Sequence, residues 1–291
     1  MDHASNTPRV APPLTLQQLV GAAERLRRRD SRREPPETWL ARVEDLRDRL
    51  MQRPFVPQPL NAFVIKEGAK ERLVTSARPG DRLLEEALLP ALRRALAPRM
   101  RPSVHGYRAG RSTSSAAVAV AQALASGHHH VACYDVQDFY GSIDRATLHT
   151  RMVTLLPAPL VAILDALVAA PLAFEGELRA TERGIPLGRP VAPLLANAYL
   201  LGLDDAMADP ALAVDVMYVR YADDLLVAAR TPEARDAAEA RIIEALGSVG
   251  LALNEKKTER LGYDGEPIAY LGHRVDELGA YGRVAGRRLA R

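Results

Sequence analysis

Apolar residues recur along much of the chain at the spacing of a helix face. A period near 3.6 residues places every third or fourth side chain on one side of a helix. Ser, Thr or Pro near the start of several of these segments fits a helix N-terminus. The pattern predicts helices over residues 14–33, 38–51, 81–96, 112–125, 144–170, 190–203 and 231–247.

Shorter apolar and β-branched runs predict strands. Residues 63–76 form two such runs around Glu67-Gly68-Ala69-Lys70, which is typical of a hairpin. Residues 214–228 form two more around Tyr221-Ala222-Asp223-Asp224. Further strands are expected over residues 131–136, 251–253 and 269–275. This order of helices and strands predicts an α+β fold with an antiparallel sheet and packed helices.

Composition excludes several classes of protein. The 291 residues are 47% hydrophobic and 26% charged, as in an ordinary globular protein with a sizeable core. The one cysteine, Cys133, excludes an internal disulfide and a zinc module built on cysteines. The N-terminus has no apolar signal core, and prolines interrupt the longest apolar stretch, residues 152–174, so that it is too broken for a membrane span. We therefore expect a cytoplasmic protein with no membrane partner.

Basic residues are concentrated in one part of the chain. The formal net charge is +3, but residues 53–111 carry twelve Arg or Lys against five Asp or Glu, a local net charge of +7. A basic region favours a polyanionic partner, although a charge surplus alone is weak evidence. All four lysines fall inside the motifs described below; they are Lys66, Lys70, Lys256 and Lys257.

Carboxylates stand where apolar strands end. Asp135 directly follows the apolar residues 131–134 of the predicted strand 131–136, and Asp223 and Asp224 occupy the tip of the predicted hairpin 214–228. A pair of aspartates in a turn is most often only solvated. If the strand and the hairpin are neighbours, however, the carboxylates meet, and hard divalent cations such as Mg²⁺ take oxygen ligands of this kind. Two such ions can clamp the attacking and leaving oxygens of a phosphoryl transfer.

Six segments between about residues 55 and 275 resemble, in order, the motifs of bacterial, group II intron-like reverse transcriptases. The segments are HGYRAGRST at 105–113, DVQDFY at 135–140, GIPLGRPVAPLLANAYL at 184–200, YADD at 221–224, LNEKKT at 253–258 and YLGHRV at 270–275. The resemblance implies a right-hand polymerase with fingers and an antiparallel palm. It also implies an RNA-directed DNA polymerase that uses an RNA template, a DNA or RNA primer and dNTPs.

The resemblance assigns the metal site and the catalytic groups. Asp135 and Asp223 would be the main ligands of Mg²⁺, with Mn²⁺ as a second candidate, and Asp224 a further carboxylate close by. The backbone carbonyl of Val136 would complete one coordination shell. Lys257 would protonate the pyrophosphate leaving group, and Lys256 is the alternative if the register differs by one residue.

The same resemblance assigns a nucleotide site. Lys66 and Arg72, on the hairpin 63–76, would hold the triphosphate. Tyr140 would lie under the sugar and exclude a ribose 2′-hydroxyl, the alternative being a core tyrosine. Leu187 and Gly188 would also line the dNTP site. Leu187 departs from the family, in which many members carry a glutamine that helps to order the nucleotide; leucine cannot make that hydrogen bond, so we expect reduced fidelity.

A further set of residues would contact nucleic acid. An aromatic ring can stack on a base while arginines hold the backbone, and the alternative is a loop that only caps the helix after it. Asn197 fits a helix packed beneath the nucleotide site, or a purely structural role. The predicted template and primer contacts are His105, Tyr107, Arg108, Arg111 and Gly272.

The resemblance also implies a division into domains. We expect an N-terminal helical extension over 1–52, fingers over 53–130, and a palm over 131–275, with residues 150–190 partly in the fingers. Residues 276–291 would be a short basic tail at the start of a thumb. Sixteen residues after Val275 are too few for a helical thumb, so the thumb is expected to be missing or truncated. A partner protein or a further C-terminal segment would then supply it.

Two other functions compete with templated synthesis. One is a defence-associated, antiviral polymerase of the same kind that makes DNA with little or no template. The other is a nucleic-acid-binding scaffold that has lost catalysis. The three carboxylates Asp135, Asp223 and Asp224 argue against the scaffold, because a scaffold has no need to hold repelling charges together.

Overall fold

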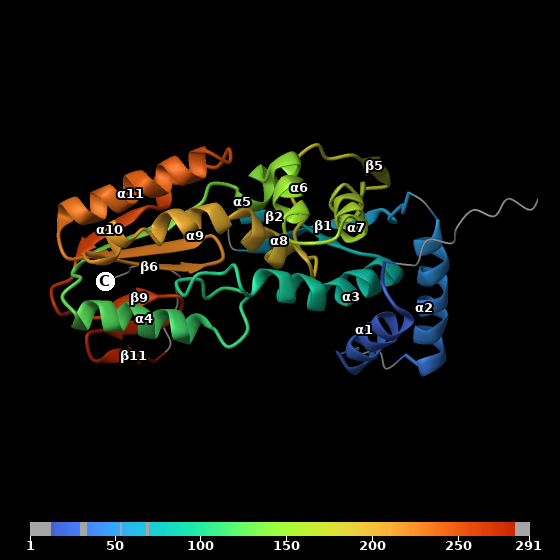
Figure 1. Ribbon diagram of the computed structural model, residues 1–291, viewed down its shortest axis with the longest axis horizontal. Coiled ribbons are helices and arrows are strands. Elements are labelled where there is room, and N and C mark those ends of the chain that lie inside the picture. Colours follow the sequence, from blue (N-terminus) through green and yellow to red (C-terminus); the bar gives the residue numbers. More distant parts are fainter. Residues whose placement is uncertain (1–12, 30–33, 53, 68–69, 283–291) are drawn as a thin grey trace, which may run out of the picture. The chain divides into compact units, whose positions relative to one another are not determined.

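The computed structural model describes residues 13–29, 34–52, 54–67 and 70–282 (Figure 1). The last residues of the predicted basic tail, 283–291, lie outside this range. The chain divides into two compact units, and each is described here by itself. No helix in the described ranges has the length and apolar character needed to cross a bilayer.

The first unit contains Met1–Pro90, Leu156–Glu182 and Leu187–Val191. Its sheet has the strand order β2-β1-β4-β5, in which β1 and β2 form an antiparallel hairpin and β4 runs parallel to β1. The hairpin predicted over 63–76 is confirmed. The elements are α1 (Leu16–Arg29), α2 (Pro36–Met51), β1 (Leu60–Glu67), β2 (Lys70–Ser76), most of α3 (Pro79–Leu96), α7 (Ala158–Val168), β4 (Leu172–Phe174) and β5 (Glu177–Arg179).

The second unit contains Ala91–Leu155, Arg183–Pro186 and Ala192–Arg291. Its helices are α4 (Thr113–Ala125), α5 (Phe139–Ser142), α6 (Arg145–Val153), α8 (Ala192–Tyr199), α9 (Leu201–Met207), α10 (Pro210–Ala213), α11 (Pro232–Gly247) and the 3₁₀ turn η1 (Glu255–Lys257). Its strands are β3 (His130–Asp135), β6 (Val216–Tyr221), β7 (Asp224–Ala229), β8 (Glu259–Gly262), β9 (Ile268–Tyr270), β10 (His273–Asp276) and β11 (Gly279–Tyr281).

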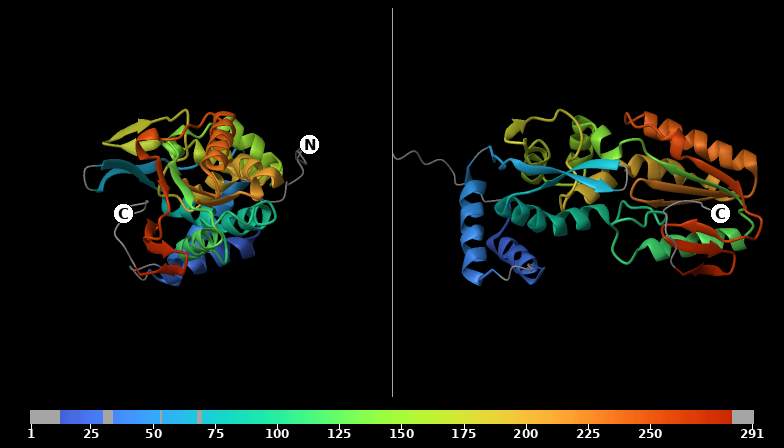
Figure 2. Two further views of the ribbon diagram at one scale, coloured as in Figure 1. Left: turned by 90° about the vertical axis from the view of Figure 1, so that its left-hand side faces the viewer. Right: turned by 180° about the vertical axis from the view of Figure 1, so that it is seen from behind.

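A four-stranded antiparallel sheet, in the order β6-β7-β3-β8, is the centre of the second unit. Because side chains alternate along a strand, β3 buries Val131 and Cys133 against α4 on one face. Tyr134 points to the other face, where its hydroxyl donates to Glu239 of α11. Figures 1 and 2 show α4 and α11 on opposite sides of this sheet. The antiparallel sheet between packed helices is as predicted.

Sequence patterns located most elements and missed the smallest ones. Ser112 caps α4 and Thr231 caps α11, as their side chains suggested. The helix predicted over 144–170 is two helices, because Pro157 begins α7 after a break. The strand predicted over 251–253 is wrong: Leu253 makes one isolated bridge to Val136. The short strands β4, β5, β8 and β11 were not predicted.

Candidate active site

The register of β3 and β7 brings the predicted carboxylates to one end of the central sheet. The Cα atoms of Asp135 and Asp224 are direct partners across the two strands. Tyr221 and Asp224 close a two-residue turn, so Asp223 is one residue away from the partner of Asp135. Asp135 is 9% exposed. Residues far apart in sequence therefore meet at the tip of the β6–β7 hairpin.

The backbone carbonyl of Val136 points to the side of β3 on which β7 and Asp224 lie. Gln137 N donates to Ala252 O at 2.9 Å, and Asn254 N donates to Asp135 O at 2.7 Å. In this antiparallel pattern the peptide groups of the intervening residue, Val136, point away from the bridging partner. Because β7 and β8 flank β3 on opposite sides, the Val136 carbonyl is directed to the β7 side, where Asp224 begins its strand.

Lys257 contacts the carboxylate of Asp135. The bridge between Val136 and Leu253 holds the chain that leads into η1, and Lys257 Nζ lies 2.6 Å from Asp135 Oδ2. This is a short, charge-assisted hydrogen bond. Lys256, the alternative candidate, has an exposed side chain. The structure therefore places Lys257, and not its neighbour, against the predicted metal ligand.

These protein oxygens fit a cation whose remaining ligands are supplied by water and by the phosphates of a substrate. In the described part of the chain, no group of three or more His, Cys, Asp or Glu side chains is arranged to hold a metal by itself. Two carboxylates and one carbonyl are nevertheless suited to Mg²⁺, which is usually bound by one or two carboxylates together with water and phosphate oxygens. The ammonium of Lys257 already shows that Asp135 accepts a positive charge here.

Tyr140 lies beside the carboxylate turn. Its ring meets Phe139 edge-on, with 5.3 Å between the ring centroids. Burial raises the pKa of the Tyr140 hydroxyl above its ordinary value, and the nearby Tyr107 and Asp223 raise the pKa further. The backbone carbonyl of Tyr140 accepts a hydrogen bond from Ile185 N at 2.9 Å. Tyr140 is thus a half-buried ring close to Asp223.

The predicted template residues fall into two groups. Tyr107 is 50% exposed, and its ring centroid lies 6.3 Å from that of Tyr221; Arg111 is also exposed. Arg108 Nη1 donates to the carbonyl of Arg101. His105 is only 2% exposed, and its Nδ1 hydrogen bonds Ser115 Oγ at 2.8 Å. A buried ring cannot stack on a base. The expectation that the His105 ring contacts the template is therefore corrected: this side chain has a structural role.

Lys66 and Arg72 lie on opposite faces of the β1–β2 hairpin. Lys66 is paired with Glu71, and Ile65 with Arg72, across the two strands. Since neighbouring residues of a strand point to opposite faces, one face presents Arg72 and the other presents Lys66. Lys66 Nζ also forms a surface ion pair with Glu71 at 3.2 Å. Each face of this hairpin therefore presents only one of these two side chains.

Leu187 and Gly188 are fixed against β2 by their backbone. The carbonyl of Leu187 accepts hydrogen bonds from Thr75 N at 2.8 Å and from Thr75 Oγ1 at 2.7 Å. Gly188 has φ 92°, and a Cβ there would come within 2.3 Å of Thr75 O. Only glycine fits at this position. The next residue, Arg189, is buried and bonded to Glu85.

Gly272 lies in a tight hairpin turn between β9 and β10. Tyr270 and His273 are paired across it, and both central residues, Leu271 and Gly272, have positive φ. This is the pattern of a type I′ turn, which glycine favours in its second position. The structure therefore gives Gly272 a conformational reason to be glycine.

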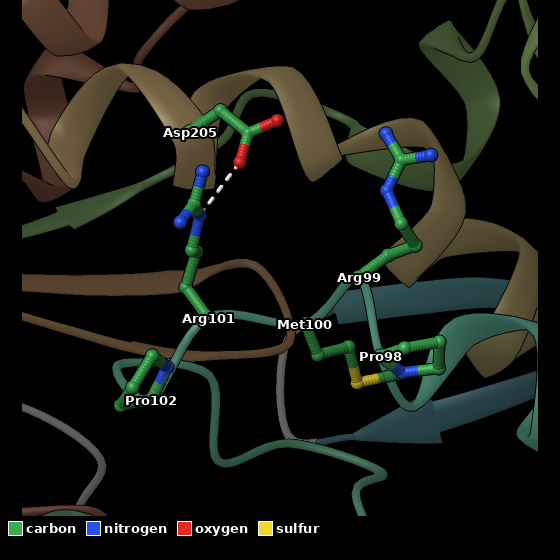
Figure 3. Close-up of a pocket in the computed structure, with 6 residues that line it drawn as sticks. All are labelled: Pro98, Arg99, Met100, Arg101, Pro102 and Asp205. Carbon is green, nitrogen blue, oxygen red and sulfur yellow. Dashed lines mark hydrogen bonds and ion pairs between the residues drawn. The ribbon is translucent and has the colours of Figure 1, made fainter.

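A small cavity in the second unit contains none of the predicted site residues. Figure 3 shows Arg101 pointing towards Asp205, with Nε 2.7 Å from Oδ1. The cavity is lined by Pro98, Arg99, Met100, Arg101, Pro102 and Asp205.

Sequence reasoning missed a buried ion pair beneath the turn. Arg220 and Asp204 are both completely buried and are bonded to each other at 2.6 Å. The signal was available: Arg220 is a charge inside the apolar run Val216–Tyr221, in the same way as Asp135 follows an apolar strand. Its partner could not be identified without the fold.

Comparison with known proteins identifies the family of this chain. Residues 64–275 match the family model described as reverse transcriptase (RNA-dependent DNA polymerase). A curated relative, the retron Mx65 reverse transcriptase of Myxococcus xanthus, is 29% identical over 165 residues. That match covers 54% of this chain and 38% of the relative, so the chain spans well under half of that protein's length.

Solved telomerase structures share the fold. Telomerase from Candida albicans, in complex with a fragment of telomeric RNA, aligns with a TM-score of 0.63 and 13% identity, over 80% of this chain and 47% of that one. Apo telomerase from Candida tropicalis aligns with a TM-score of 0.60 and 9% identity, over 79% of this chain and 49% of that one. On the match that covers residues 64–275, the chain belongs to the reverse transcriptase (RNA-dependent DNA polymerase) family.

Proposed function

We propose that this chain is a bacterial, group II intron-like reverse transcriptase that synthesises DNA from dNTPs on an RNA template. The observation that carries the proposal is the pairing of Asp135 with Asp224 across β3 and β7, with Asp223 in the adjoining turn. In this proposal the fingers span residues 53–130 and the palm spans residues 131–275, with residues 150–190 partly in the fingers. The similarity to a retron reverse transcriptase supports an RNA template.

The metal site would consist of Asp135, Asp223 and the carbonyl of Val136, with Asp224 beside them. Mg²⁺ is the proposed ion, because all of these ligands are oxygens, and Mn²⁺ would fit the same set. The bound ions would stabilise the attacking primer 3′-oxygen and the leaving pyrophosphate oxygen. The protein's own part is to hold the carboxylates on two paired strands and the turn that joins β6 to β7, where they need little reorganisation during the reaction.

The remaining residues would orient the substrates. Lys257, held on Asp135, is the proposed proton donor to pyrophosphate, and Tyr140 the proposed sugar gate. Arg72 is the preferred triphosphate ligand, with Lys66 on the opposite face of the hairpin as the alternative. Leu187 and Gly188 would border the base and sugar. On the nucleic-acid side the proposed contacts are Tyr107, Arg108, Arg111 and Gly272.

A primer-extension assay tests the proposal. The purified chain is given poly(rA)/oligo(dT) and dTTP, with and without Mg²⁺, alongside Asp223→Asn and Asp215→Asn. Asp215 is an exposed aspartate at the other end of the same hairpin. We expect Mg²⁺-dependent, template-dependent extension that Asp223→Asn lowers by at least about 100-fold and Asp215→Asn leaves unchanged.

The remaining outcomes of this assay would each favour a different function or contradict the proposed site. Product formed equally well without template would support the defence-associated polymerase. Binding of the primer–template without incorporation at any metal concentration would favour the catalytically silent scaffold. Extension that survives in both Asp223→Asn and Asp135→Asn would overturn the site altogether.

A further inference from the structure

The turn that carries Asp223 is conformationally demanding. Ala222, its first central residue, has φ 58°, a left-handed conformation that residues other than glycine adopt only when the surroundings hold it. The turn between β6 and β7 has only two residues, so contacts from outside the turn must hold its conformation. The position of the Asp223 carboxylate therefore depends on what supports Ala222.

Arg220 supports the turn from inside the protein. Its Nη1 donates to the carbonyl of Ala222 at 3.1 Å. Its other side binds Asp204 of α9 through two parallel hydrogen bonds, Nε to Oδ1 at 2.7 Å and Nη2 to Oδ2 at 2.6 Å. Both side chains are completely buried. The planar guanidinium thus fixes the Ala222 carbonyl relative to α9, which carries Asp204.

Asn197 of α8 links this pair to Gly106, which also lies against the turn. Its Oδ1 accepts from Arg220 Nη1 at 2.8 Å, and its Nδ2 donates to Gly106 O at 3.0 Å. Gly106 lies directly against the turn, because a Cβ there would come within 2.4 Å of Ala222 N. Asn197 is 1% exposed. The Gly106 backbone and the Arg220 side chain therefore both contact the turn, and the amide of Asn197 bonds to both of them.

Packing alone does not explain this arrangement. A buried ion pair contributes little stability compared with apolar residues of similar volume, so a structural role could be filled without charges. What the charged pair does offer is direction. The two hydrogen bonds of one bidentate pair with Asp204 orient Arg220, and the same guanidinium then donates to Asn197 and to the carbonyl of Ala222, the residue next to Asp223.

We infer that Arg220, Asp204 and Asn197 are positioning residues that set where the Ala222–Asp223 turn places its carboxylate. The inference rests on the proposed function in that Asp223 is taken as a metal ligand. All three side chains are buried, so none of them presents a group to a metal ion or a nucleotide at the surface. They act through the turn, in the way that outer partners of a metal ligand control affinity and rate.

The test compares two adjacent acids of α9. Asp204→Asn keeps the shape of the buried residue and removes its charge, whereas Asp205→Asn changes an exposed neighbour that pairs with Arg101 (Figure 3). For Asp204→Asn we expect the Mg²⁺ concentration at half-maximal extension to rise, or kcat to fall, by about 10- to 100-fold. The KM for dNTP should change less than about twofold, because its binding groups are elsewhere. Asp205→Asn should match the wild type.

Hydrogen exchange supplies a readout that does not need activity. In folded Asp204→Asn, amides of residues 221–225 should exchange at least about tenfold faster, while those of β3 and β7 beyond the turn stay protected. If the wild type fails to incorporate dNTP but this difference is present, the proposed function fails and the positioning role stands. A folded variant with unchanged exchange at 221–225 and unchanged Mg²⁺ dependence would overturn the inference.

A second variant covers the case in which Asp204→Asn does not fold. Asn197→Ala removes two hydrogen bonds and leaves the Arg220–Asp204 pair intact, so no buried charge loses its partner. It should show the same two effects, smaller in size. Wild-type exchange and wild-type Mg²⁺ dependence in Asn197→Ala would also overturn the inference.

Discussion

Lys257 Nζ lies 2.6 Å from Asp135 Oδ2, so the ammonium group of Lys257 forms an ion pair with the carboxylate at the end of β3. If Lys257 also donates a proton to pyrophosphate, Lys257→Gln should lower kcat by about 100-fold or more. The same change removes a positive charge that repels a metal ion at Asp135. The Mg²⁺ concentration at half-maximal activity should therefore fall while kcat falls. Steady-state extension over a Mg²⁺ series measures both.

Lys256 provides the control for that experiment. It is exposed and adjacent in sequence, and Lys256→Gln should leave kcat and the Mg²⁺ dependence unchanged. If Lys256→Gln is the impaired variant and Lys257→Gln is active, the register of the predicted motif is off by one residue.

Tyr140 should exclude ribonucleotides because its half-buried ring lies close to Asp223. Tyr140→Ala opens space where a 2′-hydroxyl would otherwise collide, and should reduce the preference for dNTP over rNTP by about 10- to 200-fold. Tyr140→Phe keeps the ring and should keep the preference. The measurement is the ratio of kcat/KM for dTTP and UTP on one primer–template, and a ratio unchanged in Tyr140→Ala would rule out the gate.

The hairpin with its carboxylates was predictable, whereas its support was not. Asp135 and Asp223 stand out because charges interrupt or follow apolar strands, and that signal is local. Asp204 lies on a helix, next to a second aspartate, and nothing in its neighbourhood identifies which of the two is buried. Its pairing with Arg220 of β6 depends on the tertiary fold, which brings the two side chains together. Local patterns likewise could not show that Lys66 and Arg72 face opposite ways.

Leu187 offers a test of fidelity that leaves the loop intact. Its backbone carbonyl is held by two hydrogen bonds from Thr75, which do not involve its side chain. Leu187→Gln should therefore add an amide at the proposed nucleotide site without moving the segment, and lower the misincorporation frequency. Leu187→Met, which adds no hydrogen-bonding group, should keep the wild-type error rate. Sequencing of extension products gives both values, and equal error rates in Gln and Met variants would refute the idea.

His105 should make the protein sensitive to acid. Burial, followed by the charges of Arg111 and Arg108, lowers the pKa of the His105 imidazole to about 4. The folded state therefore binds a proton less readily than the unfolded chain, so its contribution to stability is complete above pH 6.5 and is lost as the pH falls towards 4. If His105 alone titrates, the free energy of unfolding falls by about 1.4 kcal/mol per pH unit in that interval.

A variant isolates this contribution. His105→Gln can still hydrogen bond Ser115 but does not titrate, so its urea unfolding free energy should depend less steeply on pH between 6.5 and 4 than that of the wild type. Parallel slopes for the two proteins would show that other groups, and not His105, cause the acid sensitivity.

Arg189 should be required for the stability of the first unit, in which its side chain is buried. Arg189 Nε lies 2.8 Å from Glu85 Oε1, and both side chains are essentially inaccessible to solvent. Arg189→Ser would leave the Glu85 carboxylate buried without its partner, at a cost of about 3–5 kcal/mol in unfolding free energy. Because burial already raises the pKa of Glu85, Glu85→Gln added to Arg189→Ser should restore much of the loss. Chemical denaturation of the two variants measures this, and a double variant as unstable as Arg189→Ser would mean that the volume of the arginine, and not its charge, is what the core requires.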